Sequence, residues 1–365
     1  MKIFKITLKT LLVIAALLLI GESVIRLRGT EKLQIWSQCN YQADSILGYR
    51  YKPNSSGILR TAGFSNRYQI NGFGFTGKPF QVIKRPGTFR IIVVGASDEN
   101  GINTNGPLNY VGLLEKKFRD EGRAVEVINM AIDGKNFGIR NVRLINTECL
   151  RLNPDLILFR SEFPFSDGKK FRTTYKDIQI NYFEDYRLDL SQAKKFIDQE
   201  LLKTDFRNFL FNHSYLYRYF VNYYIKKYQS QRWLDIIGTP IVKSRNKAQG
   251  YARKQIFWCK GNVDCNIQPV QYTEEETIKM LKDLTNSLAA HKAKIYYYSF
   301  EYAPTDGRIK KIFEANHLTY FEPQIAFKTE FDFGTLDGHA SQQGHKAFAD
   351  ALFKSIRDSV DIEKK

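Results

Sequence analysis

The sequence predicts an α/β fold, a three-layer sandwich in which helices cover both faces of a central parallel sheet. Its 365 residues, 43% hydrophobic and 25% charged, suffice for one large core with an accessory part. The stretch 89–95 is a largely apolar run of strand length that ends in glycine, which is typical of a strand covered on both faces. Strands and helices then alternate, and this alternation predicts βαβ units with parallel strands.

An apolar segment at the N-terminus predicts a membrane anchor over residues 1–28. Three lysines precede the unbroken apolar run 11–20, and residues 6–25 could cross a thin bilayer with Glu22 at the far interface. We therefore expect a single-pass protein of the cytoplasmic (inner) membrane. Its main part would lie outside, in the periplasm or the extracellular space.

Two alternatives to an uncleaved anchor remain open. A run this short also suits the apolar region of a cleavable signal peptide. The small-x-small cleavage pattern is missing, however, and Leu19 with Gly21 is its nearest approach. A buried core helix is the other alternative, and the lysines before the run argue against it.

The chain is strongly basic, with 55 Lys and Arg against 38 Asp and Glu, a formal net charge of +17. Such a charge favours polyanions, which include nucleic acid, anionic lipid and acidic glycans. Charge alone does not choose among them. Because an exported protein rarely meets nucleic acid, we expect no nucleic-acid partner.

The first half of the chain predicts a collar followed by half of the α/β domain. Residues 29–88 predict an extracytoplasmic collar of extended segments and turns, since they are rich in Gly, Asn, Pro and aromatic residues without helical periodicity. Residues 89–162 predict the first half of the domain. Its expected elements are strands at 89–95, 125–131 and 156–159 and helices at 110–121 and 139–152.

Residues 163–270 interrupt the alternation and predict a mainly helical insertion beside the cleft, because their aromatic residues recur at spacings of three and four. These aromatics, interleaved with Lys and Arg, are either core and interface or a surface that stacks carbohydrate or binds an anionic polymer. Residues 271–360 predict the second half of the domain, opened by a capping box of Thr273 and Glu276. Its expected elements are helices at 274–291 and 343–357 and a strand at 294–300.

Four cysteines in an exported chain could form two disulfides. Cys259 and Cys265 enclose a short loop that would let them meet. Cys39 and Cys149 lie far apart in the sequence and are alternatively two small buried apolar residues. None of the four has zinc spacing, and the sequence predicts neither a metal nor a cofactor.

Ser97 follows the first central strand, within Gly95-Ala-Ser97-Asp-Glu-Asn-Gly101, at the edge where open α/β sheets bind their ligands. A serine in this place is alternatively the N-cap of the next helix. His339 stands just before the last helix and can reach back toward Ser97, with Asp337 close enough to orient its ring. A serine hydroxyl needs a base to take its proton, so these residues predict a nucleophile, a base and an acid.

These residues resemble the motifs of the SGNH/GDSL hydrolase family, especially its membrane-anchored bacterial branch. Gly95-Ala-Ser97 with Gly101 is similar to the first block, which carries the nucleophile. Asn129-Met-Ala-Ile-Asp-Gly134 is similar to the second block, whose glycine N–H joins the serine N–H in the oxyanion hole. Asp337-Gly-His339 with Gly344-His345 is similar to the last block, which carries the acid and the base. The resemblance implies a flavodoxin-like three-layer fold and a serine esterase.

The chain departs from the family's pattern in the third block. Where the family has Gly-x-Asn-Asp, this chain has Arg160-Ser-Glu162, so the oxyanion-hole asparagine is missing. Losing one such donor costs about 10²- to 10³-fold in rate, unless Arg160 or Ser161 substitutes for it. The family's acid lies three residues before the histidine, where this chain has Leu336. Asp337 therefore acts from an altered position, or the site is a Ser-His dyad.

Two carboxylates, Asp98 and Glu99, follow Ser97 directly and would repel a developing oxyanion if they point inward. Two functions are therefore weighed. One is a serine esterase or O-acyltransferase that acts on acyl esters, acetyl included, of cell-envelope glycans. The alternative is a catalytically degenerate scaffold of the same fold that binds an envelope polymer or a protein partner.

Overall fold

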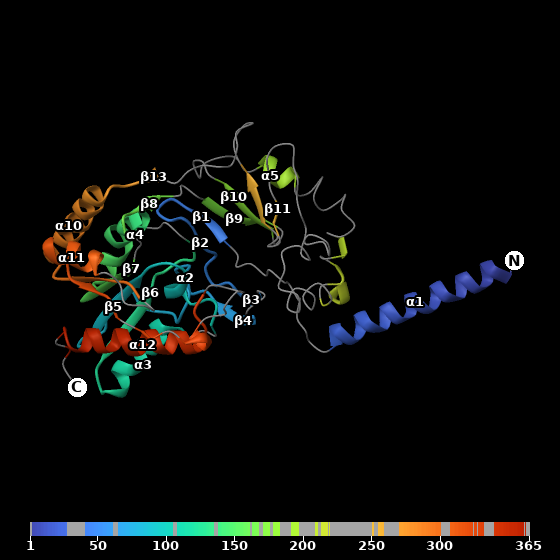
Figure 1. The fold of residues 1–365 in the computed structure, drawn as a ribbon, viewed down its shortest axis with the longest axis horizontal. Coiled ribbons are helices and arrows are strands. Elements are labelled where there is room, and N and C mark those ends of the chain that lie inside the picture. The colour runs from blue at the N-terminus through green and yellow to red at the C-terminus, as the bar shows by residue number, and fades with distance from the viewer. Residues whose placement is uncertain are drawn as a thin grey trace.

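The computed structural model describes residues 2–27, 41–60, 65–104, 108–134, 138–160, 163–167, 171–175, 178–182, 191–196, 209–210, 213–217, 219, 250–251, 255–258, 270–300, 307–323, 325–326, 328–331, 339–360 and 362. Figure 1 shows these residues as an α/β part, with one long N-terminal helix extending away from it.

A five-stranded parallel sheet forms the centre of the α/β part. Its neighbouring strands all run parallel, as the alternation of strands and helices predicts. Numbered along the chain, its strands take the order 2-1-3-4-5, which is flavodoxin-like and reverses direction between the first and third strands. In space the strands are β6 (Val125–Asn129), β5 (Phe89–Val94), β7 (Leu156–Arg160), β14 (Lys294–Tyr298) and β15 (Tyr320–Phe321).

The residues of the central strands alternate between two apolar cores. In β5, Ile91 and Val93 enter one core and Ile92 and Val94 the other, and all four are fully buried. Successive side chains of a strand point to opposite faces, so the apolar run at residues 91–94 requires cover on both faces.

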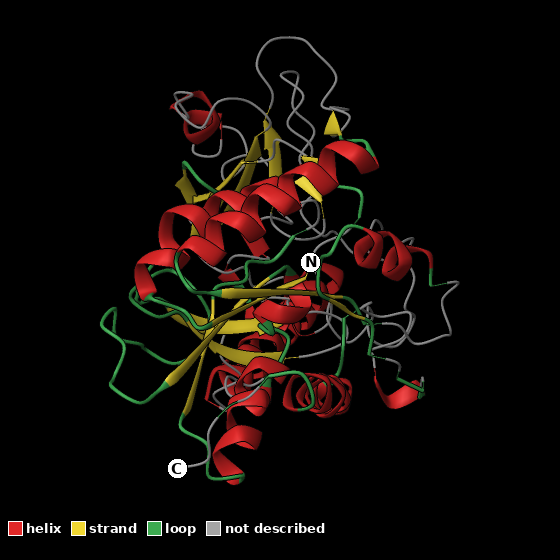
Figure 2. Ribbon diagram, turned by 90° about the vertical axis from the view of Figure 1, so that its left-hand side faces the viewer, coloured by secondary structure: helices red, strands yellow, loops and turns green. Residues whose placement is uncertain are grey.

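Helices provide that cover, which gives three layers (Figures 1 and 2). One core packs the sheet against α3 (Tyr110–Asp120) and α12 (Gln342–Arg357). The other packs it against α10 (Glu274–Ala290) and α11 (Arg308–Ala315). Figure 1 shows α3 and α12 on one side of the strands and α10 and α11 on the other.

The helix that the sequence predicts at 139–152 is not one continuous α-helix in the structure. It begins as α4 (Gly138–Leu144), continues as one π-helical turn (Ile145–Cys149) and ends in a 3₁₀ turn (Leu150–Leu152). Asn153 follows with a left-handed backbone, φ 50°, which stops the helix. Apolar spacing alone does not reveal where the helix type changes, because the π-helical and 3₁₀ segments are each about one turn long.

The collar consists of extended segments. Strand β1 (Tyr41–Asp44) pairs antiparallel with β2 (Gly48–Tyr51), and β3 (Ser56–Arg60) pairs antiparallel with β4 (Ser65–Gln69). Tyrosines of β1 and β2 are buried against the same core as α10. The collar is therefore packed onto the domain through its aromatic side chains.

The structure describes only part of the insertion at residues 163–270. The described part contains both strands and helices, and the expectation of a mainly helical insertion stays a prediction. Four strands form a second sheet, separate from the central one, in the order β11-β12-β10-β9. Most of the predicted aromatic helix lies outside the described residues. The elements are β8 (Ser166–Asp167), β9 (Phe171–Tyr175), β10 (Ile178–Tyr182), α5 (Ser191–Phe196), β11 (Gly250–Tyr251), β12 (Gln255–Trp258) and β13 (Val270–Gln271).

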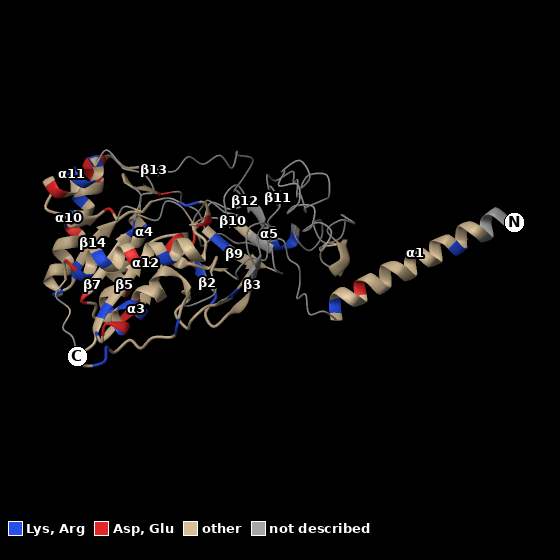
Figure 3. Cartoon of the chain, turned by 60° about the horizontal axis from the view of Figure 1, so that its bottom comes forward, with Lys and Arg blue, Asp and Glu red and all other residues tan. Residues whose placement is uncertain are grey.

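The N-terminal helix α1 (Lys2–Leu27) contains an apolar part, Ile6–Leu27, with a mean hydropathy of 2.2, and none of it is buried inside the protein. Figure 3 shows few charged residues along it. Its length and composition suit a membrane span or a signal sequence. The C-terminal end of α1 contacts residues 213–216.

Among the cysteines, Cys149 is buried and free, and its Sγ lies 3.6 Å from Met130 Sδ. It is thus a small apolar core residue, one of the two alternatives that the sequence allows. The predicted Cys259–Cys265 pair and Cys39 lie outside the described residues.

Candidate active site

Ser97 and Arg160 lie at the carboxyl ends of β5 and β7, where the strand order reverses. Open α/β sheets bind their ligands at this point. Ser97 is the first residue of the short helix α2 (Ser97–Asn100), and the N-cap is Ala96. The interpretation of Ser97 as an N-cap is therefore wrong. Its side chain instead lines a cavity.

Glu99 fixes the turn that presents Ser97. This fully buried residue accepts the Ala96 backbone N–H through Oε2 at 2.7 Å. A Cβ on Gly95 would lie 2.4 Å from the same oxygen, so only glycine fits beside Glu99. Gly101 closes the turn with φ 63°, and a Cβ there would meet Asn109 at 2.3 Å. At both positions a side chain would therefore clash, which explains why the motif has glycine there.

Arg160 offsets the two carboxylates that follow Ser97. Its Nη1 donates to Asp98 Oδ2 and to Glu99 Oε1, each at 2.9 Å. Burial raises the pKa of Asp98, but the charge and the hydrogen bond of Arg160, together with two nearby histidines, outweigh burial and bring that pKa below its usual value. One guanidinium against two carboxylates removes part of the expected repulsion of an oxyanion. Arg160 thus has a role that the sequence did not predict.

Two tyrosines extend this network into the core. Tyr110 Oη donates to Glu99 Oε1 at 2.7 Å and lies 2.6 Å from Tyr298 Oη. Both side chains are fully buried, and burial raises the pKa of each phenol well above its usual value. The phenols therefore stay protonated and available as donors. Glu99 is held by a backbone amide, an arginine and a tyrosine at once.

The loop after β6 brings Gly134 to the same cavity. Asn129 Nδ2 donates to the Glu99 carbonyl oxygen at 2.7 Å, and Asn129 Oδ1 accepts the Ala131 N–H at 3.0 Å. Gly134 has φ 129°, a backbone conformation that other residues rarely adopt. The loop is thus joined directly to the helical turn that carries Ser97.

His339 also lines this cavity, although it lies far from Ser97 in the sequence. The carbonyl oxygen of the next residue, Ala340, accepts a hydrogen bond from Asn103 Nδ2 at 2.5 Å. Asn103 follows α2, so this bond holds the histidine segment close to the Ser97 turn. The charge of His339 also lowers the pKa of Asp98. Asp337, the predicted acid, lies outside the described residues, as do Ser161 and Glu162.

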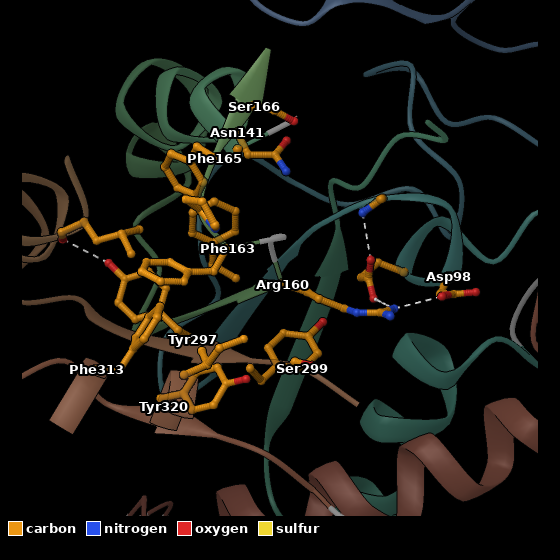
Figure 4. Close-up of a pocket in the computed structure, with 18 of the residues that line it drawn as sticks. Asp98, Asn141, Arg160, Phe163, Phe165, Ser166, Tyr297, Ser299, Phe313 and Tyr320 are labelled. Atoms are coloured by element: carbon orange, nitrogen blue, oxygen red, sulfur yellow. Dashed lines mark hydrogen bonds and ion pairs between the residues drawn. The ribbon is translucent and has the colours of Figure 1, made fainter. Parts of the chain in front are cut away.

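The cavity, of about 870 Å³, is polar at one end and aromatic at the other. Figure 4 shows Asp98 and Arg160 on one side, apart from the cluster of aromatic rings. Among the described residues, no group of three or more His, Cys, Asp or Glu could hold a metal ion. The residues that line the aromatic end include Phe159, Phe163, Phe165, Tyr297, Phe313 and Tyr320.

The geometry thus gathers Ser97, Gly134, Arg160 and His339 around one cavity, and their chemical roles stay predictions. Sequence reasoning missed the tyrosines behind Glu99 and the aromatic end of the cavity. The sequence does contain one signal for the Arg160 ion pairs, because an arginine at the end of a buried apolar strand requires a carboxylate partner. Nothing local marks Tyr110 or Tyr298, whose partners come from distant segments.

No family model matches the chain, and no curated protein sequence matches it significantly. Solved structures with some similarity include a lipase/acylhydrolase from Enterococcus faecalis, with 12% identity over 76% of this chain and 100% of that one, at a TM-score of 0.38. An esterase from Pseudoalteromonas sp. has 10% identity over 74% and 97%, at 0.37. A catalytic mutant of an acetylxylan esterase from Geobacillus stearothermophilus has 10% identity over 77% and 100%, at 0.36. At these TM-scores the likenesses assign neither a fold nor an activity to this chain.

Proposed function

We propose that this chain is a membrane-anchored serine hydrolase of the SGNH/GDSL type, an esterase or O-acyltransferase that acts on acyl esters. The observation that carries the proposal is the single cavity lined by Ser97, Gly134, Arg160 and His339. These residues come from three strand ends and the segment before the last helix. Their types match a nucleophile, a backbone oxyanion donor, a cationic donor and a base.

The reaction proceeds through an acyl-enzyme. Ser97 Oγ attacks the ester carbonyl carbon while His339 takes the hydroxyl proton. The negative oxygen of the tetrahedral intermediate accepts hydrogen bonds from the Ser97 and Gly134 amides. The ester C–O bond then breaks, and the leaving alcohol takes the proton from His339. Water or a second hydroxyl attacks the acyl-enzyme by the same steps, which restores Ser97.

Arg160 serves as the third oxyanion donor in place of the missing asparagine. Its Nη1 makes both ion pairs with Asp98 and Glu99, and we assign its Nη2 to the oxyanion. The ion pairs fix the plane of the guanidinium, so this donor is held in place before substrate arrives.

The substrate that fits an exported, anchored enzyme is an acyl ester, acetyl included, on a cell-envelope glycan. The apolar helix α1 and the +17 charge of the chain support this choice. The helix would hold the domain at the outer side of the cytoplasmic membrane, and the positive charge would attract an anionic polymer.

The test is covalent labelling of the full-length protein in detergent with a fluorophosphonate, which reacts with activated serines. We expect wild type to be labelled once per chain, and Ser97→Ala not to be labelled. Ser355→Ala, which alters a helix hydroxyl on α12 far from the cavity, is the matched control and should label like wild type. Labelling that persists in Ser97→Ala would contradict the assignment of the nucleophile.

Substitution of Arg160 tests whether the oxyanion hole consists of the two backbone amides alone or also includes Arg160. If Arg160 is a donor, Arg160→Ala should lower kcat on a short acyl ester about ten-fold or more. Arg160→Lys keeps the charge beside Asp98 and should retain more activity than Arg160→Ala. An unchanged kcat in Arg160→Ala would mean that the two backbone amides suffice.

The second candidate is a polymer-binding scaffold without catalysis, and the carboxylates beside Ser97 favour it. Asp98 and Glu99 together carry one more negative charge than Arg160 offsets. Folded wild type that neither labels nor hydrolyses acetyl, propionyl and butyryl esters would select this candidate.

A further inference from the structure

Asp133, the residue before Gly134, gathers side chains from two parts of the chain outside the central domain. Tyr51 Oη donates to its Oδ1 and Tyr41 Oη to its Oδ2, each at 2.8 Å. Arg172 Nη1 also donates to Oδ2, at 2.9 Å. Tyr49 Oη donates to the backbone carbonyl oxygen of Asp133 at 2.7 Å. We name these five residues the Asp133 clamp.

The clamp is stabilised by charge and by ring contacts. Burial raises the pKa of Asp133, but the positive charge of Arg172 and the hydrogen bonds from Tyr41, Tyr51 and Arg172 together outweigh burial, so this pKa lies below its usual value. The Arg172 guanidinium lies over the rings of Tyr49 and Tyr41, at 4.3 and 4.6 Å from their centroids. Cation–π contacts and a charge-assisted hydrogen bond thus hold one arginine against the carboxylate.

Arg172 belongs to β9 of the inserted sheet, whereas the tyrosines belong to β1 and β2 of the collar. Strand β9 contacts both β1 and β2, and Figure 1 shows the three strands side by side. Tyr41 N–H also donates to Thr174 Oγ1 at 3.0 Å. The insertion and the collar therefore meet at Asp133.

The loop between β6 and Gly134 is fixed at both ends. At its start, the Met130 N–H donates to the Val93 carbonyl oxygen at 2.9 Å, and Asn129 bonds to Glu99 as described. Its middle, Met130 to Ile132, is buried. At its far end, the Asp133 clamp fixes the side chain and the carbonyl group next to Gly134. The peptide plane that carries the Gly134 N–H includes this same Asp133 carbonyl group.

We propose that Asp133 and Arg172 are positioning residues, which orient the Gly134 amide toward the oxyanion of the reaction proposed above. The inference rests on that proposed function. Gly134 lines the cavity, whereas the clamp side chains do not appear among the described residues that line it. They act through the peptide bond from Asp133 to Gly134. The inserted sheet is thereby part of the catalytic unit.

The experiment compares Arg172→Gln and Arg172→Lys with wild type as full-length protein in detergent. We expect Arg172→Gln to lower kcat about ten-fold or more with KM within about two-fold, because only the transition state carries the oxyanion. Affinity for an alkylboronic acid, a tetrahedral analogue, should fall by a similar factor. Arg172→Lys keeps the charge and should restore part of the loss.

Arg50→Gln is the matched control. Arg50 is a similarly enclosed collar arginine that bonds to Asp44 and Glu148 and not to Asp133. It should leave kcat within about two-fold of wild type at temperatures where both variants are folded. Equal losses of kcat in Arg50→Gln and Arg172→Gln would mean general destabilisation and would overturn the positioning role.

A readout independent of activity separates this inference from the proposed function. Hydrogen exchange of the peptide that contains Gly134 should accelerate about ten-fold or more in Arg172→Gln and remain near the wild-type rate in Arg50→Gln. If exchange accelerates in Arg172→Gln but wild type shows no esterase activity, the proposed hydrolase function is refuted and the clamp is not. Unchanged exchange and unchanged kcat in Arg172→Gln, with an active wild type, would refute the clamp alone.

Discussion

At the residue scale, two histidines of the last motif have opposite environments. His339 is partly buried and lines the cavity, whereas His345, at the start of α12, is fully buried. The His345 Nδ1 accepts the Tyr110 backbone N–H at 3.2 Å. Burial lowers the pKa of His345 to about 4. It therefore stays neutral at neutral pH and is a packed core residue, although it lies within the last motif.

The buried neutral state of His345 predicts a pH-dependent stability. Its pKa rises from about 4 when folded to an ordinary 6.5 when unfolded, so between these values the unfolded state binds more protons. The free energy of unfolding should therefore fall by about 3 kcal/mol as pH drops from 7 to 4, at about 1.4 kcal/mol per pKa unit. Urea titrations of wild type and His345→Asn should show this loss only in wild type.

His291→Asn, at an exposed position after α10, is the control for this titration and should keep the wild-type slope. Asp98 and Asp133 also have lowered pKa values, and their contribution is lost only below about pH 4, where unfolded carboxylates protonate. The two windows are therefore distinguishable. An identical slope in His345→Asn and wild type would contradict the neutral, buried state.

At the scale of elements, sequence patterns predict best where the determinants are local. The capping box is one case: Thr273 Oγ1 accepts the Glu276 N–H at 3.1 Å, and Glu276 Oε2 accepts the Thr273 N–H at 2.8 Å. Apolar spacing also predicts α3, and apolar runs predict β5, β6 and β7. In the site, the glycines that flank Ser97 and Gly134 itself are local signals, because each allows a tight turn.

Elements and contacts that depend on distant partners were not predictable. Strand β10 pairs with β12 across a long intervening segment, and the aromatic spacing of the insertion instead favours helices. Arg172 shows the same difficulty, because its partner Asp133 lies on another loop and no local pattern connects them. Aromatic residues at strand positions pack well on a pleated surface, so tertiary contacts decide between helix and strand here.

The capping box gives a prediction for helix α10. Thr273→Ala removes the acceptor for the Glu276 N–H and should reduce the free energy of unfolding by about 1 kcal/mol. Asn286→Ala, an exposed substitution inside the same helix, should be neutral or slightly stabilising because alanine has the higher helix propensity. Both are measured by urea unfolding. Equal effects of the two substitutions would contradict the role of the cap.

At the scale of the whole molecule, α1 is joined to the rest of the chain by specific contacts. Glu22 accepts the N–H groups of Tyr215 and Leu216 at 2.9 and 2.8 Å and the Ser214 hydroxyl at 2.9 Å. Arg26 Nη2 donates to the His213 carbonyl oxygen at 2.8 Å. The C-terminal turn of α1 is thus joined to residues 213–216 of the chain, and the retained anchor stays a prediction.

Retention of α1 can be measured directly. The mature protein should have the mass of the full chain and stay in the membrane fraction after alkaline carbonate extraction. A C-terminal alkaline phosphatase fusion should be active, because that enzyme folds only outside the cytoplasm. Glu22→Gln should leave the mass unchanged. A mature protein that begins after residue 21 would contradict the retained anchor.

The order of the site residues along the chain has a consequence for biosynthesis. Ser97 and Gly134 leave the ribosome well before His339 and helix α12, which packs on α3. Until residue 339 has emerged, a nascent chain therefore carries Ser97 without the base that we propose for it. Truncated products that end before His339 would contain Ser97, the collar and the inserted sheet, and we expect them not to react with a fluorophosphonate.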